Sequence, residues 1–157
     1  MHLSLRCAKL TMTEMRELRT EIEIDASPEL VWQVLTDFDA YREWNPFIRS
    51  IEGEPVVGSQ LKVRIEPPGA RGMTFKPMVR AVEPARELRW LGRLFVPGLF
   101  DGEHRLALEP VGGVRSRFIQ SERFSGLLVR PLGKTLAATE QGFVEMNRAL
   151  KQRAEER

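Results

Sequence analysis

Two side chains in neighbouring segments of the chain could carry proton-transfer chemistry. His104 is the only histidine besides His2, and an imidazole can give or take a proton near neutral pH. Glu122 lies in the next apolar segment, where a carboxylate among apolar side chains can act as an acid or a base. If the protein is an enzyme, His104 and Glu122 are the candidate catalytic residues.

The alternation of side chains along a strand predicts which residues accompany these two. Successive side chains of a strand face opposite sides of the sheet, so His104 faces inward if Leu106 and Leu108 do. The following segment then turns three polar and two aromatic side chains to the same side: Ser116, Gln120 and Glu122, with Phe118 and Phe124. An apolar pocket with a few polar groups is the usual form of a small-molecule site.

A structural role explains the same residues. A histidine at the start of a strand can be held by a backbone carbonyl, and Glu122 can pair with Arg105 or Arg123. Trp44 and Trp90 could stack on a ligand, but cavity wall and core are the more usual positions for tryptophan. The sequence leaves both interpretations open.

Other chemistries lack the residues they need. One internal histidine and one cysteine, Cys7, cannot build a usual zinc site, so we expect no metal. Glycines such as Gly98 and Gly102 are expected between strands and not between a strand and a helix, so they form no nucleotide fingerprint, and we expect no cofactor. A single cysteine forms no intrachain disulfide, which is compatible with a cytoplasmic protein.

The charge distribution argues against nucleic acid and membrane partners. The net charge is +2, and the basic residues of the last segment alternate with glutamates, which is typical of a solvated helix face. The N-terminal residues are too polar for a signal peptide, and we expect no stable membrane insertion. At 157 residues the chain fits one domain, expected at 17–157, after a flexible extension at 1–16.

A helix is predicted to begin at Ser27. Ser27 can cap the first turn, and Pro28 has the backbone angle that suits the first helical position. The apolar residues that follow have helical spacing: Val31, Val34, Leu35 and Phe38. A second short helix should end near Trp44, because the residue before Pro46 is pushed out of the α region.

Beyond Pro46 the apolar residues alternate as in strands. Strands are predicted around Leu61–Ile65, Met73–Ala81, Glu87–Phe95, Glu103–Glu109 and Val114–Phe124, with an edge or a bulge expected at Pro77. From about Leu132 the pattern returns to helix, and Gly142 could allow a close contact there. A sheet with one apolar face needs a cover, so we predict an α+β fold in which about seven antiparallel strands wrap around the last helix.

Antiparallel connections place alternate loops at the same end of a sheet. This count groups the segments 44–47, 67–72, 96–100 and 125–129, and several of their residues are apolar although loops usually face water: Val96, Leu99, Phe100, Leu127, Leu128 and Val129. They could form the entrance for a hydrophobic ligand, complete the core or contact another protein. The predicted ligand-binding residues are Trp44, Phe75, Trp90, Phe100, His104, Leu106, Ser116, Phe118, Gln120, Glu122 and Leu128.

Four short motifs support a family resemblance: Ser27-Pro28-Glu29-Leu30-Val31-Trp32, Trp44-Asn45-Pro46, Gly102-Glu103-His104 and Glu122-Arg123-Phe124-Ser125-Gly126. With the order of elements, they resemble the SRPBCC (START/Bet v 1-like) superfamily in its polyketide cyclase/dehydrase-like branch, over about residues 21 to 151. The resemblance implies a helix-grip domain with a deep apolar cavity. Such domains serve lipid carriage, hormone sensing, aromatic cyclisation and chaperone regulation, so the motifs define the fold more than the activity.

The function that we expect from the sequence is binding or carriage of a hydrophobic small molecule, such as a lipid, an acyl chain or an aromatic, polyketide-like compound. One alternative is an enzyme of the cyclase, aromatase or dehydratase type that uses His104 and Glu122. A second alternative is a protein-interaction module that docks a partner on the apolar loops. We expect a monomer or a homodimer.

Overall fold

The computed structural model describes residues 14–94 and 98–157 of the chain. Strand β1 (Met15–Ile24) comes first, followed by helix α1 (Pro28–Thr36), the 3-10 turn η1 (Phe38–Ala40) and the short helix α2 (Tyr41–Trp44). Seven strands and one long helix complete the fold: β2 (Ile48–Glu52), β3 (Lys62–Ile65), β4 (Met73–Phe75), β5 (Met78–Glu83), β6 (Glu87–Leu94), β7 (Phe100–Pro110), β8 (Ser116–Ser125) and α3 (Gly133–Glu155).

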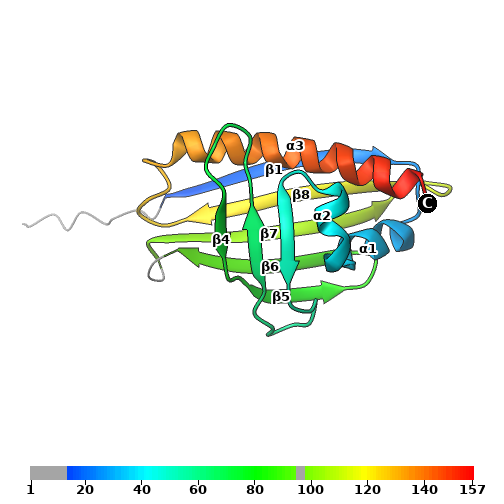
Figure 1. Ribbon diagram of the computed structural model, residues 1–157, viewed down its shortest axis with the longest axis horizontal. Coiled ribbons are helices and arrows are strands. Elements are labelled where there is room, and N and C mark those ends of the chain that lie inside the picture. The colour runs from blue at the N-terminus through cyan, green and yellow to red at the C-terminus, as the bar shows by residue number, and fades with distance from the viewer. Residues whose placement is uncertain (1–13, 95–97) are drawn as a thin grey trace, which may run out of the picture.

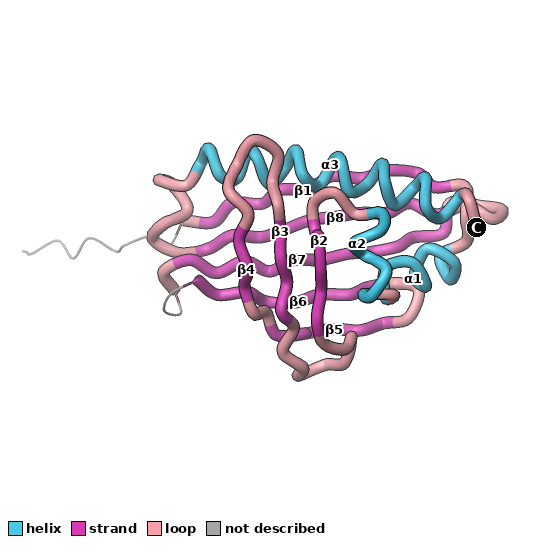
Figure 2. The backbone as a smooth tube through the Cα atoms, in the orientation of Figure 1, coloured by secondary structure: helices cyan, strands magenta, loops and turns pink. Residues whose placement is uncertain are grey.

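The strands form two antiparallel sheets. The larger sheet has the order β1-β8-β7-β6-β5, and the smaller one has the order β2-β3-β4. The three short strands run across the long ones, and α3 lies along β1 (Figures 1 and 2). The predicted α+β helix-grip fold is therefore confirmed, with eight strands in place of about seven.

The predicted strand over Met73–Ala81 is in fact two strands in different sheets. β4 pairs with β3 in the small sheet, whereas β5 pairs with β6 in the large one. Pro77 lies between them, where its missing N–H removes one ladder bond, and its carbonyl accepts a hydrogen bond from the amide of Leu61 at 2.8 Å. The irregularity expected at Pro77 is thus a corner between the sheets, and a register shift follows after Val79.

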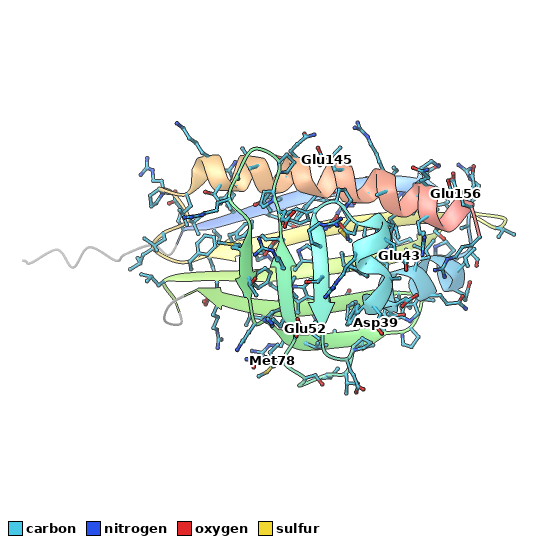
Figure 3. The ribbon with its side chains drawn as sticks, viewed as in Figure 1. Asp39, Glu43, Glu52, Met78, Glu145 and Glu156 are labelled. Carbon is cyan, nitrogen blue, oxygen red and sulfur yellow. The ribbon has the colours of Figure 1, made fainter. Side chains whose placement is uncertain are left out.

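The helical segment after β1 forms as the sequence predicts. Oγ of Ser27 accepts a hydrogen bond from the amide of Leu30 at 3.2 Å, and α1 begins at Pro28. The four apolar residues with helical spacing are all buried: Val31, Val34, Leu35 and Phe38. α2 ends at Trp44, and the charged side chains of Glu43 in α2 and of Glu156, just after α3, lie at the surface (Figure 3).

Helix α3 is fixed to the small sheet by one close approach. A Cβ added to Gly142 would overlap the ring of Phe47, which lies just before β2. Without that Cβ, the Phe47 ring reaches the helix backbone and meets the ring of Phe143 edge-on, at 5.6 Å between centroids. Gly142 therefore allows the close contact that the sequence suggested.

β1 begins at Met15, two residues before the predicted start of the domain at residue 17. Most of the predicted N-terminal extension, 1–13, lies outside the described residues. Val96 also lies outside them. In the part of the chain that the structure describes, no helix combines the length and the apolarity needed to cross a bilayer.

Candidate functional site

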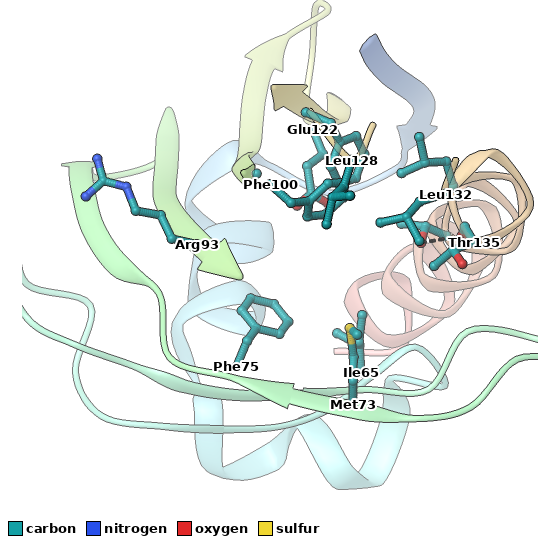
Figure 4. Close-up of a pocket in the computed structure, with 14 residues that line it drawn as sticks. Ile65, Met73, Phe75, Arg93, Phe100, Glu122, Leu128, Leu132 and Thr135 are labelled. Carbon is teal, nitrogen blue, oxygen red and sulfur yellow. Dashed lines mark hydrogen bonds between the residues drawn. The ribbon is translucent and has the colours of Figure 1, made fainter. Parts of the chain in front are cut away.

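A cavity of about 330 Å³ lies between the first turns of α3, the adjoining ends of β6, β7 and β8, and strands β3 and β4. Figure 4 shows Ile65, Met73 and Phe75 on one side of the open space, with Glu122, Phe100 and Leu128 on the other. Leu132, just before α3, and Thr135 of α3 border it from the side. Most of the wall is apolar, which suits a hydrophobic ligand.

Two glycines leave the floor of this cavity open. Gly92 of β6 and Gly102 of β7 are cross-strand partners, and both line the cavity. A Cβ on Gly92 would lie 3.3 Å from the ring of Phe75, and one on Gly102 would lie 2.7 Å from Oε1 of Glu122. The expectation that Gly102 lies between strands is wrong, since β7 begins at Phe100 and Gly102 is part of its ladder.

Glu122 turns its carboxylate to the cavity while one of its oxygens is held from behind. Its side chain is 14% exposed, and Oε2 lies 3.2 Å from Nδ1 of His104. Oε1 has no hydrogen-bond partner in the described part of the chain and lies over the position that a Cβ on Gly102 would take. The carboxylate is therefore fixed at one oxygen and available at the other.

His104 is 3% exposed and is clamped by rings on two sides. The indole of Trp90 stacks on it at 4.9 Å and 9°, and the ring of Phe143 meets it edge-on at 5.2 Å. Nε2 of His104 lies 3.2 Å from Nε2 of Gln120, and in this orientation of the Gln120 amide Nε2 of His104 accepts, which corresponds to the tautomer with its ring proton on Nδ1. His104 consequently donates its Nδ1–H to Glu122, which sets the orientation of the carboxylate.

Gln120 connects this pair to the core. Its amide nitrogen also donates to Sδ of Met146 at 3.4 Å, while its Oε1 is buried and finds no partner within residues 14–94 and 98–157. The chain Glu122–His104–Gln120 thus runs from the cavity wall into the interior. A carboxylate held in this way can accept a proton or a hydrogen bond from a molecule in the cavity.

The structure brings only part of the predicted ligand-binding set to the cavity. Four of the eleven residues line it: Phe75, Phe100, Glu122 and Leu128. Five others face the same side of the sheet but are buried behind or beside the cavity: Trp90, His104, Leu106, Phe118 and Gln120. Ser116 is also buried, and its hydroxyl donates to the carbonyl of Ala26 at 2.6 Å.

Trp44 lies elsewhere, so the expectation that it stands at the cavity rim is wrong. It borders a second pocket with Ala149, Gln152 and Arg153, on the C-terminal half of α3. The cavity borders α3 only from Leu132 to Thr139, about 15 Å or more away along the helix axis. The loop count failed because it assumed a single sheet, whereas β2, β3 and β4 form a sheet of their own across the first.

The purely structural partners considered for the two candidate catalytic residues are not the ones observed. His104 and Glu122 bind each other, and Arg105 pairs with Glu87 at 2.7 Å. The apolar loop residues mostly turn inward, since Phe100 and Val129 are buried and Leu128 lines the cavity. Leu127 is the exception, at 58% exposure.

Sequence reasoning missed several residues that shape the site. Gly92, Thr135 and Thr139 leave space and Ile65 contributes apolar wall, although no one of them carries a motif. Positions 135 and 139 of the last helix carry threonine, whereas later turns carry the larger Phe143 and Met146. This difference in side-chain size was visible in the sequence and could have indicated the cavity. In the described residues, no group of three histidine, cysteine or acidic side chains lies close enough to hold a metal ion.

Comparisons with known proteins agree with this architecture. A family model described as "Polyketide cyclase / dehydrase and lipid transport" matches residues 15–155. No curated protein matches the sequence.

Similar solved structures include the Zhui aromatase/cyclase from a Streptomyces species, with a TM-score of 0.75 and 18% identity over 92% of this chain and 96% of the other. A START superfamily protein from Mycobacterium smegmatis has a TM-score of 0.68 and 23% identity, covering 89% and 97% of the two chains. Norcoclaurine synthase from Thalictrum flavum, in complex with dopamine and hydroxybenzaldehyde, has 0.67 and 16%, covering 92% and 88%. At these identities the likeness concerns the fold.

Proposed function

Because the chain belongs to the polyketide cyclase/dehydrase and lipid transport family, we propose that it binds a hydrophobic small molecule in the cavity beside the first turns of α3. The observation that carries this proposal is the apolar cavity of about 330 Å³. Small-molecule sites range from about 300 to 1,000 Å³, so this one suits a compact aromatic or short acyl compound.

Burial of apolar surface supplies a large part of the free energy for such binding. A ligand that buries ~300 Å² of apolar surface gains about 7 kcal/mol before the entropy of association, at least about 4 kcal/mol, is subtracted. Because micromolar affinity corresponds to about 8 kcal/mol, polar contacts must supply the remainder. Binding in this cavity therefore requires burial and a few polar contacts, with no catalytic group.

The outer surface supports a small molecule over a nucleic acid as the partner. Arg115 pairs with Glu23 and Asp25, and Arg117 pairs with Glu23 and Glu109. Basic side chains that are neutralised in this way offer little attraction to phosphates. The ion-paired surface and the apolar cavity together favour a small-molecule partner.

The proposal can be tested by placing a larger side chain on α3, where it reduces the volume of the cavity. Thr139 lines the cavity, and Thr139→Leu adds apolar volume there, so we expect the affinity for aromatic and short acyl ligands to fall about tenfold. Thr36→Leu is the matched control, since Thr36 makes the same hydrogen bond to the carbonyl four residues earlier but lies on α1. Calorimetric titration with a panel of such ligands measures both variants.

Two results would contradict the proposal. One is that no ligand of the panel binds the wild-type protein and no small molecule is found with it in native mass spectrometry. The other is that Thr139→Leu and Thr36→Leu bind every ligand equally well.

A second candidate function is an enzyme in which Glu122 moves a proton of the bound molecule. The free Oε1 of Glu122 favours it, since a base must reach the proton that it abstracts. His104 would orient the carboxylate. If this is correct, Glu122→Gln lowers turnover by about 100-fold or more beyond any change in affinity, and turnover that follows affinity alone argues for a binding protein.

A further inference from the structure

We infer that the ligand is an apolar molecule with one hydrogen-bond-donating head group, a hydroxyl or an amine, and that this head group binds Oε1 of Glu122. The inference rests on the proposed binding function and narrows it to a chemical class. It also predicts that the cavity disfavours an apolar molecule with a carboxylate head group.

Glu122 places a carboxylate in an apolar wall. Among the described residues that line the cavity, it carries the only carboxylate, and the wall next to it is made by Phe100, Phe124 and Leu128. A carboxylate oxygen in apolar surroundings loses free energy unless a donor meets it. Oε1 lacks such a donor among residues 14–94 and 98–157, so a donor on the ligand would satisfy it.

The helix side of the cavity also offers an acceptor. The hydroxyl of Thr139 donates to the carbonyl of Thr135 at 2.9 Å, which uses its proton and leaves its oxygen to accept. Two elements on different sides of the cavity, β8 and α3, therefore present oxygen acceptors. These acceptors match a donor on the ligand, and the hydroxyl of Thr135, which also lines the cavity, can accept or donate.

Arg93 is the one basic residue among the described cavity-lining residues, but its guanidinium does not offer a binding partner for a ligand carboxylate beside Glu122. It lines the cavity, but its side chain is 47% exposed and its Nε lies 3.9 Å from Oδ1 of Asp101. Figure 4 shows the guanidinium of Arg93 at the left of the view, pointing away from Glu122 and from the open space. A ligand carboxylate placed beside Glu122 would meet a like charge with its counterion away from it.

The position of the Glu122 carboxylate is set before any ligand arrives. His104 holds Oε2 and is itself clamped between Trp90 and Phe143. Gly102 supplies the space that Oε1 occupies, since a Cβ there would lie 2.7 Å away. An acceptor that is fixed in advance loses little entropy when a donor binds it.

The first experiment compares head groups on one skeleton. Calorimetric titration of the wild-type protein would use 2-methylnaphthalene, 2-naphthylmethanol, 2-naphthylmethylamine and 2-naphthoate. We expect the alcohol and the amine to bind about ten- to a hundredfold tighter than methylnaphthalene, and the naphthoate to bind more weakly than the alcohol. An amine that exceeds the alcohol at low salt identifies a cationic head group, and equal affinities identify a neutral donor.

The second experiment changes the acceptor. Glu122→Gln keeps the shape of the side chain and removes its charge, so the preference for the amine over methylnaphthalene should fall about tenfold or more. Gly102→Ala should weaken the same preference, because its Cβ displaces the carboxylate without removing it. Glu103→Gln is the matched control on β7, because Glu103 lies 3.6 Å from Arg89 in an ion pair and does not line the cavity.

The outcomes separate this inference from the proposed function. Naphthoate binding as tightly as the alcohol, or an unchanged head-group preference in Glu122→Gln and Gly102→Ala, overturns the inference while cavity binding stands. If none of the four compounds and no member of the wider panel binds, the proposed function fails and the inference fails with it. Should Glu122→Gln not fold, the wild-type series and Gly102→Ala still decide.

Discussion

The two ends of the interior are built on the same sheet and the same helix, yet one is filled and the other is open. The solid half lies beside the C-terminal part of α3 and holds Phe47, Phe118, Phe143 and Leu150, each at most 2% exposed. The hollow half lies beside the first turns of α3, where Gly92, Gly102, Thr135 and Thr139 stand. The cavity thus arises from small side chains at a few positions and needs no change of fold.

The boundary between the halves is polar. Glu122 faces the hollow half, His104 stands between the rings of Trp90 and Phe143, and Gln120 reaches Met146 in the solid half. A buried polar atom without a partner, such as Oε1 of Gln120, lowers stability by about 1–3 kcal/mol. The destabilising polar groups of the domain therefore lie at the boundary between the filled half of the interior and the cavity.

The largest expected effect comes from deleting one leucine in each half. Leu150→Ala should lower the free energy of unfolding by about 3–5 kcal/mol, because the solid half cannot collapse around the void. Leu136→Ala should lower it by about 2 kcal/mol, since Leu136 already borders the cavity and loses fewer contacts. Urea unfolding measures both, and equal losses would break the distinction between the halves.

A methyl group added to each half should affect stability unequally. Gly142→Ala drives a Cβ into the ring of Phe47 and should destabilise the fold by about 1–3 kcal/mol, although alanine is the better helix former. Gly92→Ala places its methyl 3.3 Å from the ring of Phe75, which borders the cavity and can shift slightly. The free energy of unfolding should therefore change by less than about 1 kcal/mol, while the cavity becomes narrower. A more stable Gly142→Ala protein would show that the solid half has spare room.

The polar boundary can be probed with a double-mutant cycle. Gln120→Leu removes the donor to Nε2 of His104 but also the unpartnered Oε1, so it should lower stability by about 1 kcal/mol or less, whereas His104→Phe should lower it by about 1–2 kcal/mol. The two changes together should cost about 1 kcal/mol less than their sum, because the apolar pair leaves no unpaired nitrogen between Trp90 and Phe143. Strict additivity, measured by thermal unfolding of the four proteins, would mean that the His104–Gln120 contact contributes nothing.

The smallest effect is expected on the surface of the solid half. Arg153 pairs with Glu43 at 2.6 Å beside the second pocket, but the Glu43 side chain is largely exposed. Glu43→Gln should therefore change stability by less than about 1 kcal/mol, and added salt should reduce even that difference. A loss above about 2 kcal/mol, as in the buried variants, would require this pair to be counted as part of the solid half.

Local patterns predicted most of the elements. The cap at Ser27, the apolar spacing of α1 and the alternation along β7 and β8 depend on neighbours in the chain, so they can be read from the sequence. The contact between His104 and Glu122 was also partly predictable, because strand alternation placed both side chains on one face of the sheet. The register that sets them opposite each other is a pairing between strands, which alternation alone does not define.

The features that sequence reasoning missed depend on tertiary structure. Alternation tells which face a side chain occupies but not how deep it lies, so Phe118 and Phe75 looked equivalent although one fills the core and the other lines the cavity. The strands form two sheets where the loop count assumed one, and Trp44 borders a different pocket. No local pattern encodes where one sheet gives way to another.

The contact between Gly142 and Phe47 divides α3 into two stretches with different structural demands. Beyond Gly142 the helix meets packed rings, and a changed side chain there disturbs folding itself. Before it, Thr135 and Thr139 border open space, so substitutions at these positions alter what fits without disturbing the rest. Ligand preference can consequently diverge among descendants of this chain through a few positions in two turns of one helix, while the remainder of that helix keeps the architecture constant.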